Sequence, residues 1–447
     1  MGPQQIPSST QRQCPSGTVT GCRFGEYETY FSIPFSTTST DFSEPKLLFH
    51  AGNISAETPE ARDVGLSITV PTGTRAGQDL PVIAFIHGGR YEHGHYDSPG
   101  YTGKGFAKSG CIFVSIGYRR QFEGFANFPG SMPGQYRGVQ DCATALEWLQ
   151  HNIESFGGDP TNITLMGQSA GGGIALWLSR RDHYCGAFRR VIALSPAFPR
   201  QGFHTRIKTL NLLTLGKGTK EYLAELSIEK RSRIYWRFRN FYLDDMALGP
   251  YPFDPEEFAE VPMLLSSTRE EMFLEPTAKL FDSLRMHKLV IQTRGRTFGT
   301  TNPKRYIEEM ERLGLNRISG HFIGDSTIRR WVSSTAEHAP GPRWLMEFTG
   351  VEGLPACHCV DLPLIFNDLY TNPPRITQLL GPNAPKTHAQ LAQKVHDIAL
   401  SFARGETPQW PKYSPQSRIC RSISLNGNIS VSHDPLRIIR ESFACAA

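Results

Sequence analysis

Apolar runs of five or six residues alternate with helical segments through the first half of the chain and return later. β-Branched and aromatic residues are frequent in these runs, which predicts buried strands at 81–86, 111–116, 162–166, 190–194, 261–265 and 344–348. Apolar residues at helical spacing predict a helix over 138–155 and a final amphipathic helix over 388–404. Buried strands separated by helices are typical of an α/β fold with a mostly parallel central sheet covered on both faces.

The remaining segments differ in composition from this core. Residues 1–25 are polar and rich in Ser, Pro and Gln, which predicts a loose N-terminal arm. Residues 201–260 are charged, aromatic and helical in character, and we expect them to form a helical insertion that covers a site. We expect residues 26–447 to form a single domain that includes this insertion.

Charge and composition exclude several classes of partner. The 447 residues carry 47 basic and 42 acidic side chains, a formal net charge of +5, and the basic residues are dispersed. We therefore expect the Arg-Arg pairs at solvated edges and no nucleic-acid partner. No apolar run approaches the length of a membrane span.

The start of the chain and its cysteines bear on the compartment. Residues 1–6 lack the charged start and apolar core of a signal peptide, so we expect a cytoplasmic protein, or a secreted one if a leader has been removed. The nine cysteines are an odd number in a chain too long to need disulfide stapling, which favours buried thiols. Cys14 and Cys22 could close a small loop if the protein is exported.

The segment 167–171, Gly-Gln-Ser-Ala-Gly, matches the nucleophile elbow pattern Gly-x-Ser-x-Gly. A predicted strand precedes it and a helical run follows it, which is the setting that this pattern requires. Small residues are favoured there because the turn is so sharp that flanking side chains would collide with neighbouring backbone. Ser169 is therefore a candidate nucleophile, placed at the N-terminus of the following helix.

Two further segments fit a serine-hydrolase site. The run His-Gly-Gly-Arg at 87–90 ends a strand, and its glycines would let backbone N–H groups approach a carbonyl oxygen as an oxyanion hole. His358 precedes an apolar segment, which suits a loop that carries a general base over the sheet. Its neighbours Cys357 and Cys359 lack a second paired cluster, so we expect no metal site.

The orienting acid has three candidates. In hydrolases with this nucleophile elbow, the acid lies between the serine and the histidine along the chain. Glu270 and Glu271 follow the predicted strand at 261–265, and Asp325 is an outlier in the same interval. The residues alone do not choose among these three carboxylates.

The run 147–172 (EWLQHNIESFGGDPTNITLMGQSAGG) is long and specific, and it resembles the type-B carboxylesterase (cholinesterase-like) family. Shorter segments at 85–90, 117–119, 358–362 and 402–405 also resemble family landmarks, in the expected order. The resemblance spans about 20–415 and implies the α/β-hydrolase fold, with a single catalytic domain over 26–447. The intervals between the triad positions are short for the family, which implies a reduced helical lid insertion.

Carried over residue by residue, the resemblance implies specific roles. The nucleophile, general base and acid of the catalytic triad would be Ser169, His358 and Glu271. The backbone N–H groups of three residues would form the oxyanion hole: Gly89, Arg90 and Ala170. Ser195 falls where the family keeps a serine near the acid. No cofactor or metal is implied.

Arg90 departs from the glycine that is usual at its position in the family. Its N–H can still serve the oxyanion hole. Its guanidinium either leans into the acyl pocket and favours an anionic acyl group, or points to solvent or pairs with a local carboxylate. The first disulfide of the family is absent at 62–66, which fits a reducing compartment.

The expected function is that of a serine carboxylic-ester hydrolase, which acts on a small-molecule ester through an acyl-enzyme intermediate. An alternative is acyl transfer to another acceptor, or a different natural-product tailoring reaction on the same scaffold. A third alternative is a non-catalytic binding module. Such members typically lose the serine or the histidine, and this chain has both.

Overall fold

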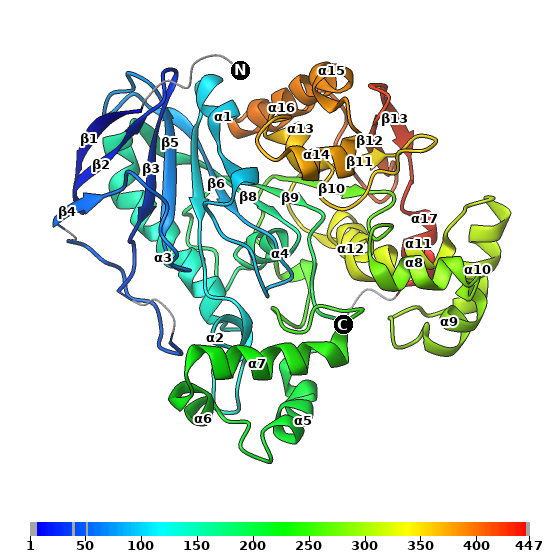
Figure 1. Cartoon of the computed structure of the whole chain (residues 1–447). Helices are drawn as coiled ribbons and strands as arrows, with labels where there is room; N and C mark the ends of the chain where they lie inside the picture. The colour runs from blue at the N-terminus through cyan, green and yellow to red at the C-terminus, as the bar shows by residue number, and fades with distance from the viewer. Residues whose placement is uncertain (1–6, 38–40, 51, 444–447) are drawn as a thin grey trace.

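The computed structural model describes residues 7–37, 41–50 and 52–443. Its centre is one large sheet with helices on both faces (Figure 1). The strands are β1 (Ser8–Cys14), β2 (Gly17–Arg23), β3 (Tyr27–Ile33), β4 (Gly52–Ser55), β5 (Leu66–Pro71), β6 (Leu80–Ile86), β7 (Ile112–Ile116), β8 (Gly158–Gln168), β9 (Arg190–Leu194), β10 (Met263–Thr268), β11 (Arg343–Thr349), β12 (Ile419–Ser424) and β13 (Ile429–His433).

The sheet order is β1-β2-β3-β5-β7-β6-β8-β9-β10-β11-β12-β13, and β4 pairs with β2. From β7 to β12 in this order, all neighbouring strands are parallel. The strands at the two ends pair antiparallel. The predicted mostly parallel sheet is thus confirmed, and each of the six predicted strands lies in its parallel part.

Helices cover both faces of the sheet. Those that pack near its centre are α1 (Lys104–Lys108), α3 (Arg137–Asn152), α4 (Ala170–Trp177), α13 (Asp361–Ile365) and α16 (Ala389–Ala403). Successive residues of β6 point to opposite faces. Val82, Ala84 and Ile86 pack in a core with residues of α3 and α4. Ile83 and Phe85 pack in a second core with residues of α1, α13 and α16. Both faces of β6 are therefore buried, as its apolar run predicts.

The expectation of a loose N-terminal arm is wrong for residues 8–23. These residues form the β1–β2 hairpin, which extends the sheet at one end. Arg12 of β1 donates to the buried carboxylate of Glu28 at 2.8 Å and to the hydroxyl of Tyr30 at 3.0 Å, both on β3. An edge strand needs few apolar residues, because much of its surface faces solvent. Residues 1–6 of the predicted arm lie outside the described residues.

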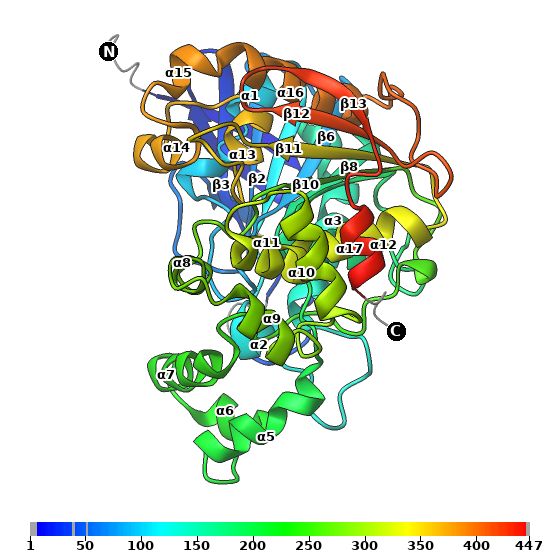
Figure 2. The same cartoon turned by 90° about the vertical axis from the view of Figure 1, so that its right-hand side faces the viewer.

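Two groups of helices leave the sheet as separate excursions (Figures 1 and 2). The insertion predicted over 201–260 contains α5 (Phe203–Leu213), α6 (Lys220–Glu225) and α7 (Ile228–Arg239), which project from one end of the molecule. The second excursion lies between β10 and β11 and was not predicted. It contains α8 (Pro276–Ser283), α9 (His287–Arg294), α10 (Pro303–Arg312), α11 (Ile318–Gly324), the π-turn η5 (Asp325–Arg329) and α12 (Arg330–His338).

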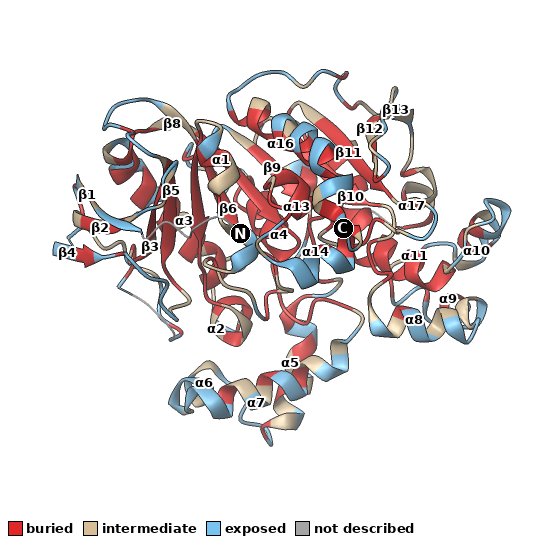
Figure 3. Cartoon of the chain, turned by 45° about the horizontal axis from the view of Figure 1, so that its top comes forward, coloured by how far each residue is buried: buried red, intermediate tan, exposed pale blue. Residues whose placement is uncertain are grey.

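Burial separates the sheet from these excursions. The central strands are buried along most of their length, whereas α6 and α7 expose much of their surface (Figure 3).

The remaining α-helices are α2 (Gln121–Phe125), α14 (Pro373–Leu380), α15 (Ala384–Thr387) and α17 (Arg437–Ser442). None of the described helices has both the length and the apolar character that crossing a bilayer requires.

Candidate active site

Ser169 lies at the tight turn between β8 and α4, where its backbone has φ 55° and ψ −121°. Few non-glycine residues adopt a positive φ, so the surrounding structure must hold the serine in this conformation. The flanking glycines are sterically required. A Cβ on Gly167 would lie 2.2 Å from the carbonyl oxygen of Gly171, and a Cβ on Gly171 would lie 2.0 Å from that of Ile86. The strand, turn and helix predicted around 167–171 are present.

His358 and Glu271 are in direct contact, although 87 positions separate them in the chain. The Nδ1 atom of His358 lies 2.6 Å from Oε2 of Glu271, and the backbone N–H of His358 donates to the backbone carbonyl of Glu271 at 3.0 Å. The other carboxylate oxygen, Oε1, accepts from the Ser195 hydroxyl at 2.7 Å and from the Thr268 N–H at 2.8 Å. Glu271 is buried, and these contacts fix its carboxylate toward the imidazole.

The other two acid candidates lie elsewhere. The carboxylate of Glu270 accepts from the N–H groups of Gly350 and Ala356, at 3.1 and 2.8 Å, and so braces the loop that carries His358. Asp325 accepts from the Tyr306 hydroxyl at 2.7 Å and pairs with Arg329 at 2.8 Å, in the helical excursion between β10 and β11. Of the three carboxylates, the structure brings only that of Glu271 to His358.

The environment of His358 favours its charged form. Burial works against a charged imidazole, but the neighbouring Cys359 and the Glu271 carboxylate raise the pKa of His358 well above its usual value. Burial also raises the pKa of Asp361 to about 7, and the charge of Glu271 adds to the effect.

Ser169 and His358 line the same cavity, of about 570 Å³. The Nε2 atom of His358, which faces away from Glu271, lies 3.2 Å from the side-chain nitrogen of Gln168. The same nitrogen lies 3.3 Å from the sulfur of Cys359. A hydrogen bond from Ser169 to His358 is not among those of the described residues, so an amide stands where the serine proton would be received. The sequence interpretation assigned no part to this Gln168 contact.

The loop at 87–94, which we call the glycine loop, follows β6 and borders the cavity. Gly89 has φ 123°, and a Cβ there would lie 2.0 Å from the carbonyl oxygen of His93. Arg90 also has a positive φ, of 58°. Within the described parts of the chain, no hydrogen bond is donated by the backbone N–H groups of Gly89, Arg90 and Ala170. Among the described residues, these three backbone N–H groups therefore have no hydrogen-bond partner: two lie in the glycine loop and one follows Ser169.

The guanidinium of Arg90 is held by the protein. Its Nη2 donates to the carbonyl of Asp245 at 2.5 Å and to that of Leu243 at 3.2 Å. Its Nε lies 3.8 Å from the carboxylate of Glu92, which is buried. The guanidinium thus lies beside a local carboxylate, which is one of the orientations considered from the sequence, and Arg90 also lines the cavity.

Helix α14 supplies a wall of the cavity that the sequence interpretation missed. The apolar lining residues include Tyr101, Leu362, Pro363, Ile376 and Leu379, and the polar lining residues include Asp368, Thr371, Asn372 and Arg375. The signal that could have found this helix is Asn372 at its N-cap, followed by two prolines. Among the described residues, no three His, Cys, Asp or Glu side chains are grouped as metal ligands would be.

The parallel sheet, the strand–turn–helix at Ser169 and the contact of His358 with Glu271 are features of the α/β-hydrolase fold. The model of the family described as "Carboxylesterase family" matches residues 64–207. Para-nitrobenzyl esterase of Bacillus subtilis is 26% identical over 420 residues, which are 85% of this chain and 82% of that protein. These similarities to carboxylesterases support a carboxylic ester hydrolase.

Solved structures give the same fold. The carboxylesterase of Geobacillus stearothermophilus superposes with a TM-score of 0.81 at 22% identity, over 97% of this chain and 100% of that chain. Among the curated relatives, fumonisin B1 esterase of Sphingopyxis macrogoltabida is 24% identical and covers 76% of this chain and 69% of its own length.

Proposed function

We propose that Ser169 is the nucleophile, His358 the general base and Glu271 the orienting acid of an enzyme that hydrolyses small-molecule carboxylic esters. The observation that carries this assignment is the 2.6 Å contact between His358 and the buried Glu271, in a cavity that Ser169 also lines. The assignment also accounts for the strained backbone of Ser169 at this turn.

The reaction begins with proton transfer from Ser169 to His358. Nε2 of the imidazole must be free to accept this proton, so the Gln168 amide moves away from it when substrate binds. The serine oxygen then attacks the ester carbonyl. Glu271 holds Nδ1 in its protonated form and stabilises the imidazolium that results.

The negative charge on the carbonyl oxygen is received by backbone donors. The N–H groups of Gly89, Arg90 and Ala170 form the oxyanion hole, and their lack of partners within the described residues supports this role. His358 then gives its proton to the leaving alcohol. Water repeats the sequence on the acyl-enzyme, which releases the acid and restores Ser169.

The cavity dimensions support a small-molecule substrate. A volume of about 570 Å³ lies within the range of pockets that enclose drug-sized molecules. Its apolar wall along α14 suits the hydrocarbon part of an ester.

We further propose a cytoplasmic location. The eight described cysteines are free thiols, as expected in a reducing compartment. Cys14 and Cys22 lie on paired strands, but Cys14 is opposite Gly17 and Cys22 is opposite Ser9. This register separates the two sulfurs that a small disulfide loop would join.

The test of the proposed function is the turnover of 4-nitrophenyl acetate by the Ser169→Ala variant. We expect kcat to fall by a factor on the order of 10⁴ or more, because the covalent route is lost. Ser9→Ala, an exposed serine on the edge strand β1, serves as the control and should retain full activity. Normal turnover by Ser169→Ala would refute the assignment.

A further inference from the structure

Two contacts fasten the glycine loop to the helical insertion. Arg90 donates to the carbonyls of Asp245 and Leu243. Both belong to residues 243–247, which follow α7 and which we call the strap. Arg239 of α7 donates to the carboxylate of Glu92 at 3.3 Å, which joins the same two segments at a second point. The loop that carries two of the proposed oxyanion donors is thus attached to the insertion by side chains on both segments.

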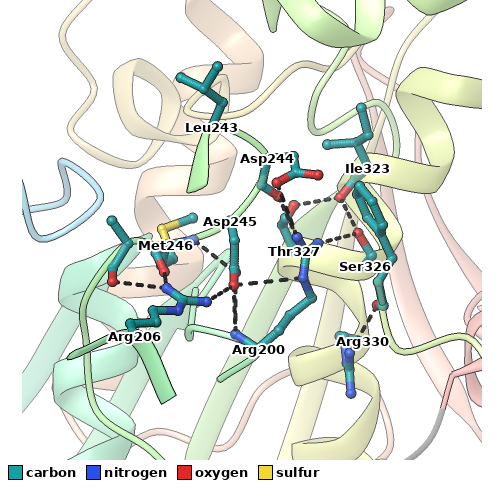
Figure 4. Close-up of polar contacts among 12 residues, drawn as sticks. Arg200, Arg206, Leu243, Asp244, Asp245, Met246, Ile323, Ser326, Thr327 and Arg330 are labelled. Atoms are coloured by element: carbon teal, nitrogen blue, oxygen red, sulfur yellow. Dashed lines mark hydrogen bonds and ion pairs between the residues drawn. The ribbon is translucent and has the colours of Figure 1, made fainter. Parts of the chain in front are cut away.

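The strap is itself anchored by a buried carboxylate. Asp245 accepts from the backbone N–H of Arg200 at 3.2 Å and from that of Met246 at 2.8 Å, and it pairs with the Arg206 guanidinium (Figure 4). Arg206 also donates to the carbonyls of Met246 and Ala247, the second at 2.9 Å. Because these groups are buried, each lost partner would leave a charge or dipole unsatisfied, which holds the strap in one conformation.

The anchor also reaches the second helical excursion. Arg200 donates to the carbonyl of Asp244 at 3.0 Å and to the hydroxyl of Ser326, in η5, at 3.3 Å (Figure 4). Its guanidinium lies 4.2 Å from the centre of the Phe298 ring. The strap is therefore tied both to α5 of the insertion, through Arg206, and to the helices that follow β10.

Arg90, which joins the glycine loop to the strap, has a strained backbone. Arg90 has φ 58°, a conformation that non-glycine residues keep only when their surroundings enforce it. We propose that the Arg90 side chain and the Asp245 strap are a positioning device that fixes the direction of the Arg90 N–H in the oxyanion hole. Through this device the helical insertion sets the rate of the chemical step. The inference rests on the proposed function, since it assumes that this N–H receives the oxyanion.

The test compares Arg90→Gly with the wild type. Glycine adopts a positive φ without strain, so this variant removes the guanidinium and relieves the backbone at the same time. A side chain that served only to hold the fold would leave kcat unchanged in a folded variant. Positioning predicts that kcat and kcat/KM fall together by about 10- to 100-fold while KM stays within about threefold. Affinity for a trifluoromethyl ketone, which forms the tetrahedral adduct, should fall in parallel.

Two further variants make the test decisive. Arg90→Lys keeps one donor for the strap carbonyls and should recover part of kcat, and Asp245→Asn should lower kcat in the same pattern as Arg90→Gly. Arg233→Ala, an exposed arginine on α7, is the control and should leave kcat unchanged. Thermal unfolding shows which variants are folded, and if Arg90→Gly is unfolded, Arg90→Lys and Asp245→Asn carry the test.

The outcomes separate this inference from the proposed function. If folded Arg90→Gly has the kcat and the ketone affinity of the wild type while Ser169→Ala is inactive, the positioning role alone is overturned. A rise in KM without loss of kcat would also overturn it, because that result marks a substrate contact. Full activity of Ser169→Ala would instead refute the proposed function.

Discussion

At the scale of single residues, Cys359 and Glu271 together raise the pKa of the proposed base, His358. Catalysis needs neutral His358, and the Glu271 carboxylate, with Cys359, raises the pKa of His358 above its ordinary value. Activity is then lost as the pH falls through this raised pKa, so the acidic limb of kcat/KM should lie above about pH 6.5. In Glu271→Gln, we expect kcat to fall by about 100- to 10,000-fold and the acidic limb to move to lower pH.

The neighbouring glutamate provides a matched control. Glu270→Gln keeps an oxygen for the N–H groups of Gly350 and Ala356, so its kcat should change by less than roughly tenfold, with an unmoved acidic limb. Equal losses in the two variants, or a limb that stays in place in Glu271→Gln, would contradict the role of Glu271. The residues alone leave Glu270 and Glu271 equivalent, because the choice depends on which carboxylate faces the returning loop of His358, and only the family resemblance assigned the role to Glu271.

At the scale of elements, strands of the sheet centre are predictable because each is a short apolar run buried on both faces. The β1–β2 hairpin is not, because its residues are polar and its place depends on Arg12 meeting Glu28 of β3. Arg12→Ala should lower the free energy of unfolding by about 2–3 kcal/mol, since it removes a partner from a buried carboxylate. Urea unfolding measures this loss.

Arg23 offers the comparison within the same hairpin. It pairs with the same Glu28 at 2.9 Å, but its side chain is 45% exposed, against 14% for Arg12. Arg23→Ala should therefore cost less than about 1 kcal/mol. Small and equal losses for the two variants would indicate that the hairpin contributes little to the fold, as a loose arm would.

At the scale of the whole molecule, the helical excursions meet at the strap, and this meeting has no sequence signal. The insertion over 201–260 is predictable from its composition, but its attachment depends on Arg90, Asp245 and Arg200, which lie far apart in the chain. The second excursion was missed because its short helices pack mainly on one another. Its buried Arg329 bridges Asp325 and Glu347 of β11, a link that only the folded chain creates.

The most direct measurement is the site of covalent labelling by an organophosphonate, located by mass spectrometry of peptides. The account predicts a single adduct on the peptide that contains Ser169, loss of esterase activity in proportion to labelling, and no adduct in Ser169→Ala. An adduct on a different serine that abolishes turnover would contradict the account, and so would full turnover by a protein labelled completely at Ser169.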